Sequence, residues 1–305
     1  MNILITGGTG FVGEKILDLL QADNKIKTIS LTTRNQSKYE KLLSKYAKVK
    51  LIEWDSNQEL SSEDIKDIDA VINLQGENIS NGRWTEEQRS RIYNSRVKGT
   101  NILIDSLLKY SPNLSIFIQT SAIGIYPVDQ AQKLTETSKV APEGFLPKVC
   151  KDWEAPLERL TSNIRVVTLR VGVVFDKTGG AIAKMKLPFL LGLGGILGSG
   201  KQEMSWIHRS DLASLYHSAL VSDAYQGVYN AVAPEVITNY KFTKTLGRII
   251  KRPTIFPVPA LMLKLLFGEM SSLLLDSQHV ESTKLPQAGF QFQYPTLQKA
   301  LEEIF

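Results

Sequence analysis

Residues 6–13 read TGGTGFVG and follow directly on a short apolar run at 2–5. The glycines at positions 8, 10 and 13 have the G-x-G-x-x-G spacing of a dinucleotide-binding turn, and those at 7, 10 and 13 fit its seven-residue variant. Glycine permits the tight turn, brings the backbone close to a pyrophosphate and lets the next helix pack against the strand. The free N–H groups of that helix then face the anion. We therefore expect a strand at 2–6, a helix at 11–20 and a dinucleotide between them.

Outward from this turn, short apolar runs alternate with helical patterns through the first half of the chain. Strands separated by helices imply right-handed crossovers and a parallel sheet. The predicted fold class is therefore α/β, a doubly wound parallel (Rossmann) sheet with a smaller C-terminal substrate lobe. We expect an NADP-binding domain over residues 1–235, with an inserted substrate loop at about 176–205, and the lobe over 236–305. The expected strands are 28–33, 49–54, 70–74, 115–120, 165–174 and 228–231, and the expected helices are 86–108, 148–160 and 210–221.

Composition narrows the class of protein. The 305 residues are 43% hydrophobic and 22% charged, as in globular proteins, which excludes disorder and fibres. A single cysteine cannot form an internal disulfide, so we expect a reducing cytoplasm. The net charge of +5 comes without a run of five or more like charges, so no nucleic-acid partner is expected. The three histidines are dispersed, and we expect no metal site.

The longest apolar tract near the C-terminus covers residues 255–267 and contains two prolines and a lysine. It is shorter than the roughly 20 residues that a spanning helix needs, so we expect no membrane partner. Its spacing predicts a helix that packs Leu261, Met262, Leu265 and Leu266 into the core. A groove for an acyl group is the alternative.

The end of the second strand bears on the choice of cofactor. An acid there binds the ribose 2′-hydroxyl of NAD, whereas an arginine accommodates the 2′-phosphate of NADP. Residues 32–35 read TTRN, with no acid and with Arg34 in place. We therefore expect NADP(H), with an ordinary surface charge as the alternative role of Arg34.

Several motifs along the chain resemble the NAD(P)-dependent epimerase/dehydratase family of the short-chain dehydrogenase/reductase superfamily. The later motifs look like its atypical branch, described as sugar-nucleotide epimerase-like. The resemblance runs nearly end to end and implies an NADP-binding domain followed by a substrate lobe. The motifs are TGGTGFVG at 6–13, NLQGEN at 73–78, SRVKGTN at 95–101, RVGVV at 170–174, GSG at 198–200 and WIHRSDL at 206–212.

This resemblance also implies cofactor contacts, residue by residue. The turn and the start of its helix would hold the pyrophosphate, the second strand end the adenosine phosphate, and the fourth strand end the adjoining ribose. The implied residues are Gly7, Thr9, Gly10, Phe11, Val12 and Gly13, then Thr33 and Arg34, Leu74 and Gln75, Arg96, and Val173 beside the nicotinamide.

Catalysis is where the chain departs from the superfamily, which uses a serine together with a Tyr-x-x-x-Lys pair. Ser121 fits the serine, but Leu146 and Cys150 occupy the tyrosine and lysine slots. The atypical branch is itself described by cysteine in the lysine slot and by arginine where a helix asparagine is usual, a position that Arg96 matches. A second Tyr-x-x-x-Lys string begins at Tyr240, too late in the chain, and we expect it to start a surface helix.

Two residues keep alternative interpretations. Tyr126 is a substitute acid or base, or else a packed aromatic. Cys150 is a thiolate whose pKa is lowered by Lys148 and Lys151, or else a small hydrophobic residue that fills the space of the missing lysine. His208 likewise either lines the cleft or caps the helix that starts near Ser210.

The sequence therefore predicts an NADP(H)-dependent oxidoreductase or epimerase that exchanges hydride with a hydroxyl or carbonyl substrate. Ser121 and Arg96 would polarise the substrate oxygen, and Tyr126 or Cys150 would complete proton transfer. The expected partner is a small molecule, with a nucleotide sugar as one candidate. The alternative is a noncatalytic NADP(H) sensor that has lost the Tyr-Lys pair. A homodimer through the helices at 86–108 and 148–160 is a family-style expectation.

Overall fold

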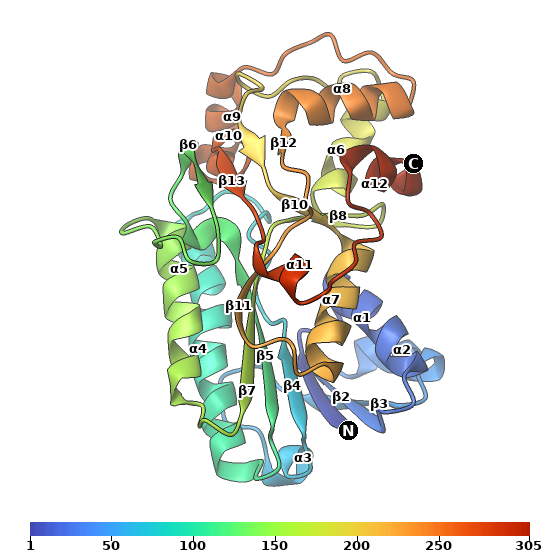
Figure 1. Ribbon diagram of the computed structural model, residues 1–305, viewed down its shortest axis with the longest axis vertical. Helices are drawn as coiled ribbons and strands as arrows, with labels where there is room; N and C mark the ends of the chain where they lie inside the picture. Colours follow the sequence, from blue (N-terminus) through green and yellow to red (C-terminus); the bar gives the residue numbers. More distant parts are fainter.

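The computed structural model describes the backbone of residues 1–305 and all side chains except those of residues 42–43 and 129–131. Its centre is a seven-stranded sheet, drawn in the lower part of Figure 1, in the order β11-β7-β5-β4-β1-β2-β3. All neighbouring strands in it run parallel. The strands are β1 (Asn2–Thr6), β2 (Thr28–Thr33), β3 (Val49–Glu53), β4 (Ala70–Asn73), β5 (Ile116–Ala122), β7 (Arg165–Val171) and β11 (Gly227–Ala231).

The strand order reverses between β1 and β4, which makes this a doubly wound sheet, as the sequence predicts. In such sheets a ligand binds at the carboxyl ends of the strands beside the reversal. The turn at 7–10 lies at that point. The helices are α1 (Phe11–Ala22), α2 (Glu40–Lys45), α3 (Ser62–Ile65), α4 (Glu86–Tyr110), α5 (Phe145–Glu154), α6 (Gly180–Leu190), α7 (Arg209–Val221), α8 (Asn239–Ile249), α9 (Ala260–Phe267), α10 (Ser272–Leu275), α11 (Lys284–Gln287) and α12 (Leu297–Ile304).

Helices cover both faces of the sheet because its strands carry apolar side chains on both. Successive side chains of a strand point to opposite faces. Ile3 and Ile5 accordingly join Leu17 of α1 and Tyr216 of α7 in one core. Leu4, between them, lies in a second core with residues of α4 and β5. Figure 1 shows α4 and α5 on one side of the sheet and α1 and α7 on the other.

Two predicted elements are divided in the structure. The helix expected at 148–160 is α5 followed by a 3₁₀ turn at 155–159, since Pro156 has no N–H to continue the α-helical hydrogen bonds. The strand expected at 165–174 is divided into β7 and the short β8 (Val173–Phe175). The chain leaves the main sheet at Gly172, and β8 pairs with β10 (Trp206–His208). A Cβ at Gly172 would stand 2.7 Å from the carbonyl oxygen of Ser205, so only glycine fits this crossing.

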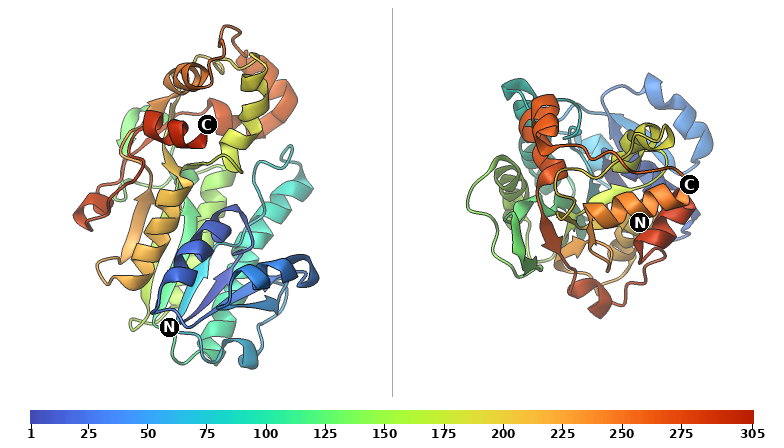
Figure 2. Two further views of the ribbon diagram at one scale, coloured as in Figure 1. Left: turned by 90° about the vertical axis from the view of Figure 1, so that its right-hand side faces the viewer. Right: turned by 90° about the horizontal axis from the view of Figure 1, so that it is seen from above.

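The opposite end of the molecule has its own apolar core. Phe175 and Trp206 stack there, with 5.1 Å between ring centroids, and Phe242 of α8 packs against Phe175. Segments from 173–206 thus share a core with α8 and α12, at the upper end in Figure 2. The division at residue 235 stays a prediction. The small strands outside the main sheet also include β6 (Asp129–Leu134), β9 (Glu203–Met204), β12 (Ile237–Thr238) and β13 (Gln278–Val280).

The apolar tract at 255–267 forms α9, but its predicted packing was wrong. Leu261, Met262, Leu265 and Leu266 are all exposed, and Leu263 is the buried residue of the helix. One face of α9 contacts the rest of the chain, so apolar side chains on its other faces remain in solvent. Among the described residues, no helix is both long and apolar enough to cross a membrane.

Candidate cofactor and substrate site

The turn between β1 and α1 has a backbone that requires glycine. Gly7 adopts a φ of 67°, and the N–H of Gly10 donates to the carbonyl of Gly7 over 3.0 Å. A Cβ at Gly7 would stand 2.8 Å from the carbonyl oxygen of Leu74, and one at Gly13 would overlap the carbonyl of Gly8. The turn therefore brings α1 directly onto the strand ends, as the motif predicts.

The N-terminus of α1 is open to a ligand. Gly10 caps the helix without a side-chain hydrogen bond, so the N–H groups of the first turn remain available to an anion. Thr9 is half-buried, and Val12 packs against the main core. The ring of Phe11 lies under the guanidinium of Arg209, whose Cζ is 4.5 Å from the ring centroid. These residues fit a pyrophosphate held by backbone amides.

The two predicted adenosine-end residues lie at the end of β2. Thr33 is buried, and its hydroxyl accepts a hydrogen bond from the N–H of Asn35 over 3.2 Å. Arg34 follows on the exposed edge, and within the described part of the chain its side chain makes no hydrogen bond or ion pair. Its planar donors are suited to a phosphate.

Leu74 and Gln75 follow β4, opposite the turn. The N–H of Leu74 donates to the carbonyl of Thr6 over 3.0 Å. Gln75 is buried against Gly99 of α4, and its Oε1 accepts a hydrogen bond from Ser56 over 3.2 Å. Its Nε2 is buried and has no hydrogen-bond partner among the side chains and backbone that the structure describes. A buried donor of this kind is costly unless a ligand satisfies it.

A buried polar network beneath the site was missed by the sequence reasoning. Asn73 accepts a hydrogen bond from Thr6 and donates to Thr100 and Gln119, in each of the last two cases over 2.9 Å. The indole of Trp153 donates to the hydroxyl of Thr100 over 3.0 Å. The network joins β1, β4 and β5 to α4 and α5. Its signal in the sequence was an asparagine inside an otherwise apolar strand.

Ser121 lies near the end of β5, in register with Arg170 of β7. Its side chain is buried, and its hydroxyl has no hydrogen-bond partner among the described residues. A hydroxyl can donate one hydrogen bond and accept others. Ser121 therefore has hydrogen-bonding capacity that the protein itself does not use.

Arg96 projects from α4 toward the loop after β4. Its Nη1 donates to the carbonyls of Glu77, over 2.9 Å, and Ile92, over 3.2 Å. The Cζ of Arg96 lies 5.0 Å from the centroid of the Trp153 ring. A Cβ on Gly76 would stand 2.7 Å from the same Cζ atom. Burial lowers the pKa of Arg96 to about 10, which leaves the side chain charged at neutral pH.

Tyr126 is buried, and its hydroxyl is fully engaged. It donates to Oδ1 of Asn230 over 2.8 Å and accepts from Nη1 of Arg170 over 2.9 Å. Arg170 also forms a two-pronged ion pair with Glu154 of α5, with hydrogen bonds of 3.0 and 2.8 Å. Burial raises the pKa of the Tyr126 phenol. These contacts fit the packed aromatic, while its role as an acid or base stays a prediction.

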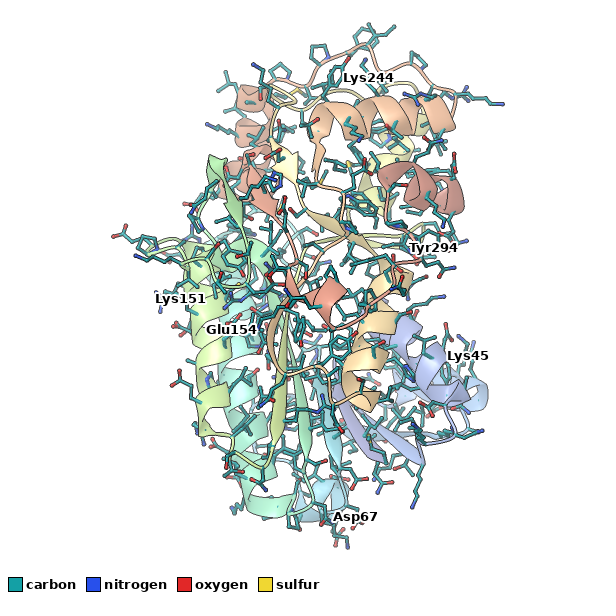
Figure 3. The ribbon with its side chains drawn as sticks, viewed as in Figure 1. Lys45, Asp67, Lys151, Glu154, Lys244 and Tyr294 are labelled. Atoms are coloured by element: carbon teal, nitrogen blue, oxygen red, sulfur yellow. The ribbon has the colours of Figure 1, made fainter. Side chains whose placement is uncertain are left out.

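The environment of Cys150 favours the alternative to a thiolate. The thiol is buried, and burial, with a smaller contribution from Glu154, raises its pKa to about 12. The two lysines expected to lower this pKa lie on the outside of α5. Lys148 pairs with Asp152 over 2.6 Å, and Lys151, labelled in Figure 3 with Glu154, is exposed. Cys150 therefore has the environment of the small hydrophobic residue that was the alternative.

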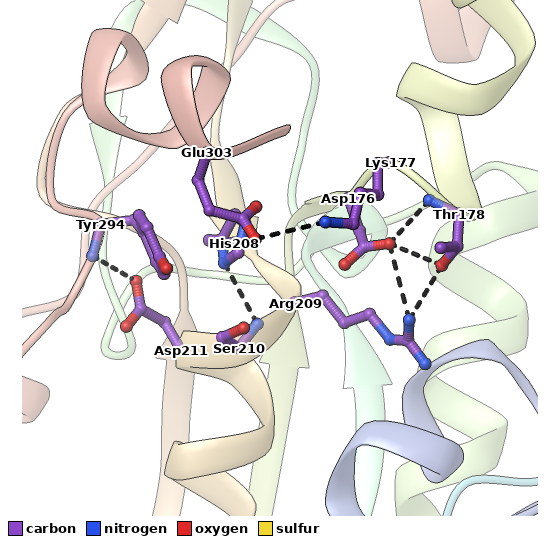
Figure 4. A network of polar contacts seen from close by, with 9 residues as sticks. All are labelled: Asp176, Lys177, Thr178, His208, Arg209, Ser210, Asp211, Tyr294 and Glu303. Carbon is purple, nitrogen blue, oxygen red and sulfur yellow. Dashed lines mark hydrogen bonds and ion pairs between the residues drawn. The ribbon is translucent and has the colours of Figure 1, made fainter. Parts of the chain in front are cut away.

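Val173 and His208 belong to the strands that connect the two ends of the molecule. The N–H of Val173 donates to the carbonyl of Ser205 over 3.0 Å. His208 caps α7, because its Nδ1 accepts a hydrogen bond from the N–H of Ser210 over 3.2 Å, which confirms the capping interpretation. Its Nε2 pairs with Glu303 of α12 over 3.1 Å (Figure 4).

Arg209 follows in the same network and was also missed by the sequence reasoning. Its Nη1 donates to the hydroxyl of Thr178 over 2.9 Å and lies 3.5 Å from a carboxylate oxygen of Asp176 (Figure 4). The network holds α7 and the segment after β8 against the start of α1. Tyr240, in contrast, is exposed near the start of α8, as expected for the second Tyr-x-x-x-Lys string.

A doubly wound parallel sheet, a glycine turn at its reversal and an uncapped helix N-terminus together define a protein of the dinucleotide-binding class. The comparison with family models is specific. The model of the NAD dependent epimerase/dehydratase family matches residues 3–231, and the chain belongs to this family. A model described as a domain of unknown function (DUF1731) matches residues 258–304.

Relatives match over nearly the whole chain. An epimerase family protein of Staphylococcus saprophyticus is 36% identical, with 99% of both proteins covered. The crystal structure of human epimerase family protein SDR39U1 with NADPH has a TM-score of 0.88 at 32% identity and covers 100% of this chain and 99% of its own. A nucleoside-diphosphate sugar epimerase from Corynebacterium glutamicum has a TM-score of 0.77 at 26% identity, covering 100% of this chain and 58% of its own. UDP-glucuronic acid 4-epimerase from Bacillus cereus, 16% identical, shows the shared fold alone.

Proposed function

We propose that this protein is an NADP(H)-dependent oxidoreductase or epimerase acting on a hydroxyl or carbonyl substrate, with a nucleotide-activated sugar as one candidate. The observation that carries the proposal is the buried, unpartnered hydroxyl of Ser121 at the carboxyl end of β5. A buried hydroxyl without a partner is unfavourable in the free protein and gains a hydrogen bond when a substrate oxygen arrives. Packing alone does not require a serine there.

NADP(H) is the proposed cofactor because the groups present fit its phosphates. The glycine turn and the open N-terminus of α1 suit the pyrophosphate, and the exposed Arg34 suits the 2′-phosphate. The buried Nε2 of Gln75 offers one more donor near the adjoining ribose. The NADPH in the structure of the human relative supports this choice.

The nicotinamide, when bound, supplies or accepts a hydride. Ser121 would donate a hydrogen bond to the reacting oxygen of the substrate, and the charged Arg96 would stabilise negative charge as it develops there. Arg96 is suited to this role because two backbone carbonyls and the Trp153 ring hold its guanidinium in place.

Proton transfer would proceed without the usual side-chain pair. Leu146 and Cys150 occupy the two slots, the Cys150 thiol stays protonated, and the Tyr126 hydroxyl is held by Asn230 and Arg170. We expect water or a group of the substrate itself to exchange the proton. Such a site favours substrates whose oxygen ionises readily.

The loss of the Tyr-Lys pair also favours a second function, a noncatalytic NADP(H) sensor. In that role the cofactor would set the conformation that a partner recognises. Under either function the reducing cytoplasm remains the proposed location on the evidence of the single cysteine. The homodimer through α4 and α5 also remains a proposal, which light scattering tests.

The two functions predict different changes in NADPH absorbance at about 340 nm when candidate nucleotide sugars, aldehydes and quinones are added. An enzyme oxidises NADPH with one of them, and Ser121→Ala lowers kcat by about 100-fold while NADPH binding is kept. Ser30→Ala is the matched control, since the buried hydroxyl of Ser30 also has no partner in the described part of the chain but lies within β2. Product analysis detects epimerisation, which leaves absorbance unchanged.

Loss of activity in both serine variants would reflect folding rather than chemistry. If NADPH binds tightly but no compound of the panel causes oxidation or gives an epimerised product, the proposed function becomes the noncatalytic sensor.

A further inference from the structure

The end of the molecule farthest from the central sheet exposes an unusual number of large apolar side chains. On α9, Leu261 and Leu265 are 69% and 67% exposed, and Met262 and Leu266 are also exposed. These four residues stand at i, i+1, i+4 and i+5 and therefore form one continuous stripe along the helix. Large contiguous apolar surfaces are rare on soluble monomers and mark interaction sites.

The stripe continues onto two neighbouring segments. The chain after α6 runs beside the chain before α9, since Arg252 Nε donates to the carbonyl of Leu190 over 2.9 Å and Leu197 pairs with Val258. Both segments lie at the upper end in Figure 1 and in the left view of Figure 2. We call the whole surface the apolar face; it consists of Leu187, Leu190, Leu191, Leu193, Ile255, Phe256, Leu261, Met262, Leu265 and Leu266.

The segments that carry the apolar face are basic, and the nearest exposed acids, Glu269 and Asp276, follow α9. Residues 177–202 and 236–268, which carry the face, contain ten lysines and arginines and no aspartate or glutamate. The whole chain has 36 basic and 31 acidic residues, so the remainder carries five more acids than bases. Lys264 stands on α9 beside the stripe, and the exposed Lys186, Lys251 and Arg252 border the other segments.

This charge distribution restricts what covers the face. A second copy docked face to face would bring two surfaces with an excess of basic residues together, which is unfavourable. The occupant must be apolar in its interior and anionic at its surface. A membrane of anionic lipid has both properties: leucines enter the boundary between headgroups and acyl chains, while lysines and arginines contact the headgroups.

We propose that the apolar face docks this protein on an anionic lipid surface. The contact is interfacial and needs no spanning helix, so it agrees with the lengths of the described helices. It goes against the expectation of no membrane partner, which considered spanning segments alone. The two cavities described in the structure, between α8 and α12 and beside β11 and α11, are lined by other residues. Neither of these two cavities lies on the apolar face.

Sedimentation of the full-length protein with lipid vesicles tests the proposal. Vesicles of phosphatidylcholine with about 30% phosphatidylglycerol should bind at least about tenfold more protein than pure phosphatidylcholine, and added salt should weaken binding. Leu261→Asn/Leu265→Asn should lower binding by about tenfold or more, and Lys251→Gln/Lys264→Gln by about fivefold.

Matched controls change the same residue types elsewhere. Leu108→Asn alters an exposed leucine of α4, and Lys50→Gln/Lys66→Gln removes two exposed lysines at the opposite end of the molecule. These variants should bind vesicles like the parent protein. Unchanged NADPH binding in every variant shows that the fold is intact.

Absence of binding to the anionic vesicles overturns the proposal, and so does binding that the face and control variants lower equally. A dimer that Leu261→Asn/Leu265→Asn dissociates, without vesicle binding, would show that a second copy covers the face. The vesicle result does not depend on catalysis, so the proposed function can fail without affecting it.

Discussion

The two ends of the cofactor site differ in how far they follow the pattern of the superfamily. At the glycine turn, both the spacing and the geometry are kept: Gly7 has a positive φ, and Gly13 lies against Gly8. At the other end, Leu146 and Cys150 occupy the two catalytic slots, and an ion pair between Arg170 and Glu154 lies close by. Backbone amides bind the anion at the first end, whereas the second end needs particular side chains for its chemistry.

This contrast implies that cofactor binding and proton transfer are separable in this fold. The turn requires glycine at Gly7 and Gly13, because a Cβ at either position meets backbone. Proton transfer requires side chains with accessible titrating groups, and burial has removed that property from Cys150. Substitutions at the two ends should therefore have unequal effects on NADPH binding.

The largest effect is expected for Gly13→Ala. Its methyl group would overlap the backbone of Gly8 and displace α1 from the turn. We expect NADPH affinity, measured by fluorescence titration, to fall by about 100-fold or more. Gly124→Ala is the comparison at the other end, because its methyl group would lie at an ordinary 3.4 Å from Leu146. Equal losses in the two variants would show that the two ends are coupled.

The elements of the sheet were predictable because each strand is a short apolar run between turns or helices. Strands β1 and β2 were predicted with the bounds they have, and α4 differs by two residues at its end. The packing of α9 was not predictable, since Leu261 and Leu263 look alike in the sequence and only the neighbouring segments decide which is covered. Propensity and periodicity identify an element, but tertiary contacts choose its buried face.

A smaller effect is expected for Arg34→Ala, which tests the adenosine end alone. If Arg34 binds the 2′-phosphate, NADPH affinity should fall by about tenfold while NADH affinity changes by less than about twofold. Lys50→Ala, which removes an exposed cation from the neighbouring β3, is the control. Isothermal titration with both cofactors gives the ratio. A parallel loss for NADPH and NADH would leave Arg34 an ordinary surface charge.

The candidate site was predictable where a motif fixes the backbone, and less so where several side chains cooperate. Gln75 and Ser121 came from the resemblance, and the structure adds that each has a buried polar atom for which the described residues offer no partner. The Asn73 network joins five elements, so the asparagine in its apolar run indicates a buried polar group but does not reveal its partners. Lys148 and Cys150 are close in sequence but lie on different sides of α5, so their separation depended on which face of the helix is buried.

The smallest effect is expected at Cys150, and there the absence of an effect is informative. The pKa of this thiol in the folded protein is about 12, so it stays protonated well above neutral pH. Because Cys150 is the one cysteine of the chain, iodoacetamide labelling followed by mass spectrometry reports on it alone. We expect almost no labelling of the folded protein between about pH 7 and pH 9, rapid labelling in urea, and less than about a twofold change in NADPH binding or turnover in Cys150→Ala. Labelling of the folded protein with a midpoint below about pH 8, together with loss of turnover in Cys150→Ala, would support the thiolate interpretation. The second end of the site would then have a titrating group of its own.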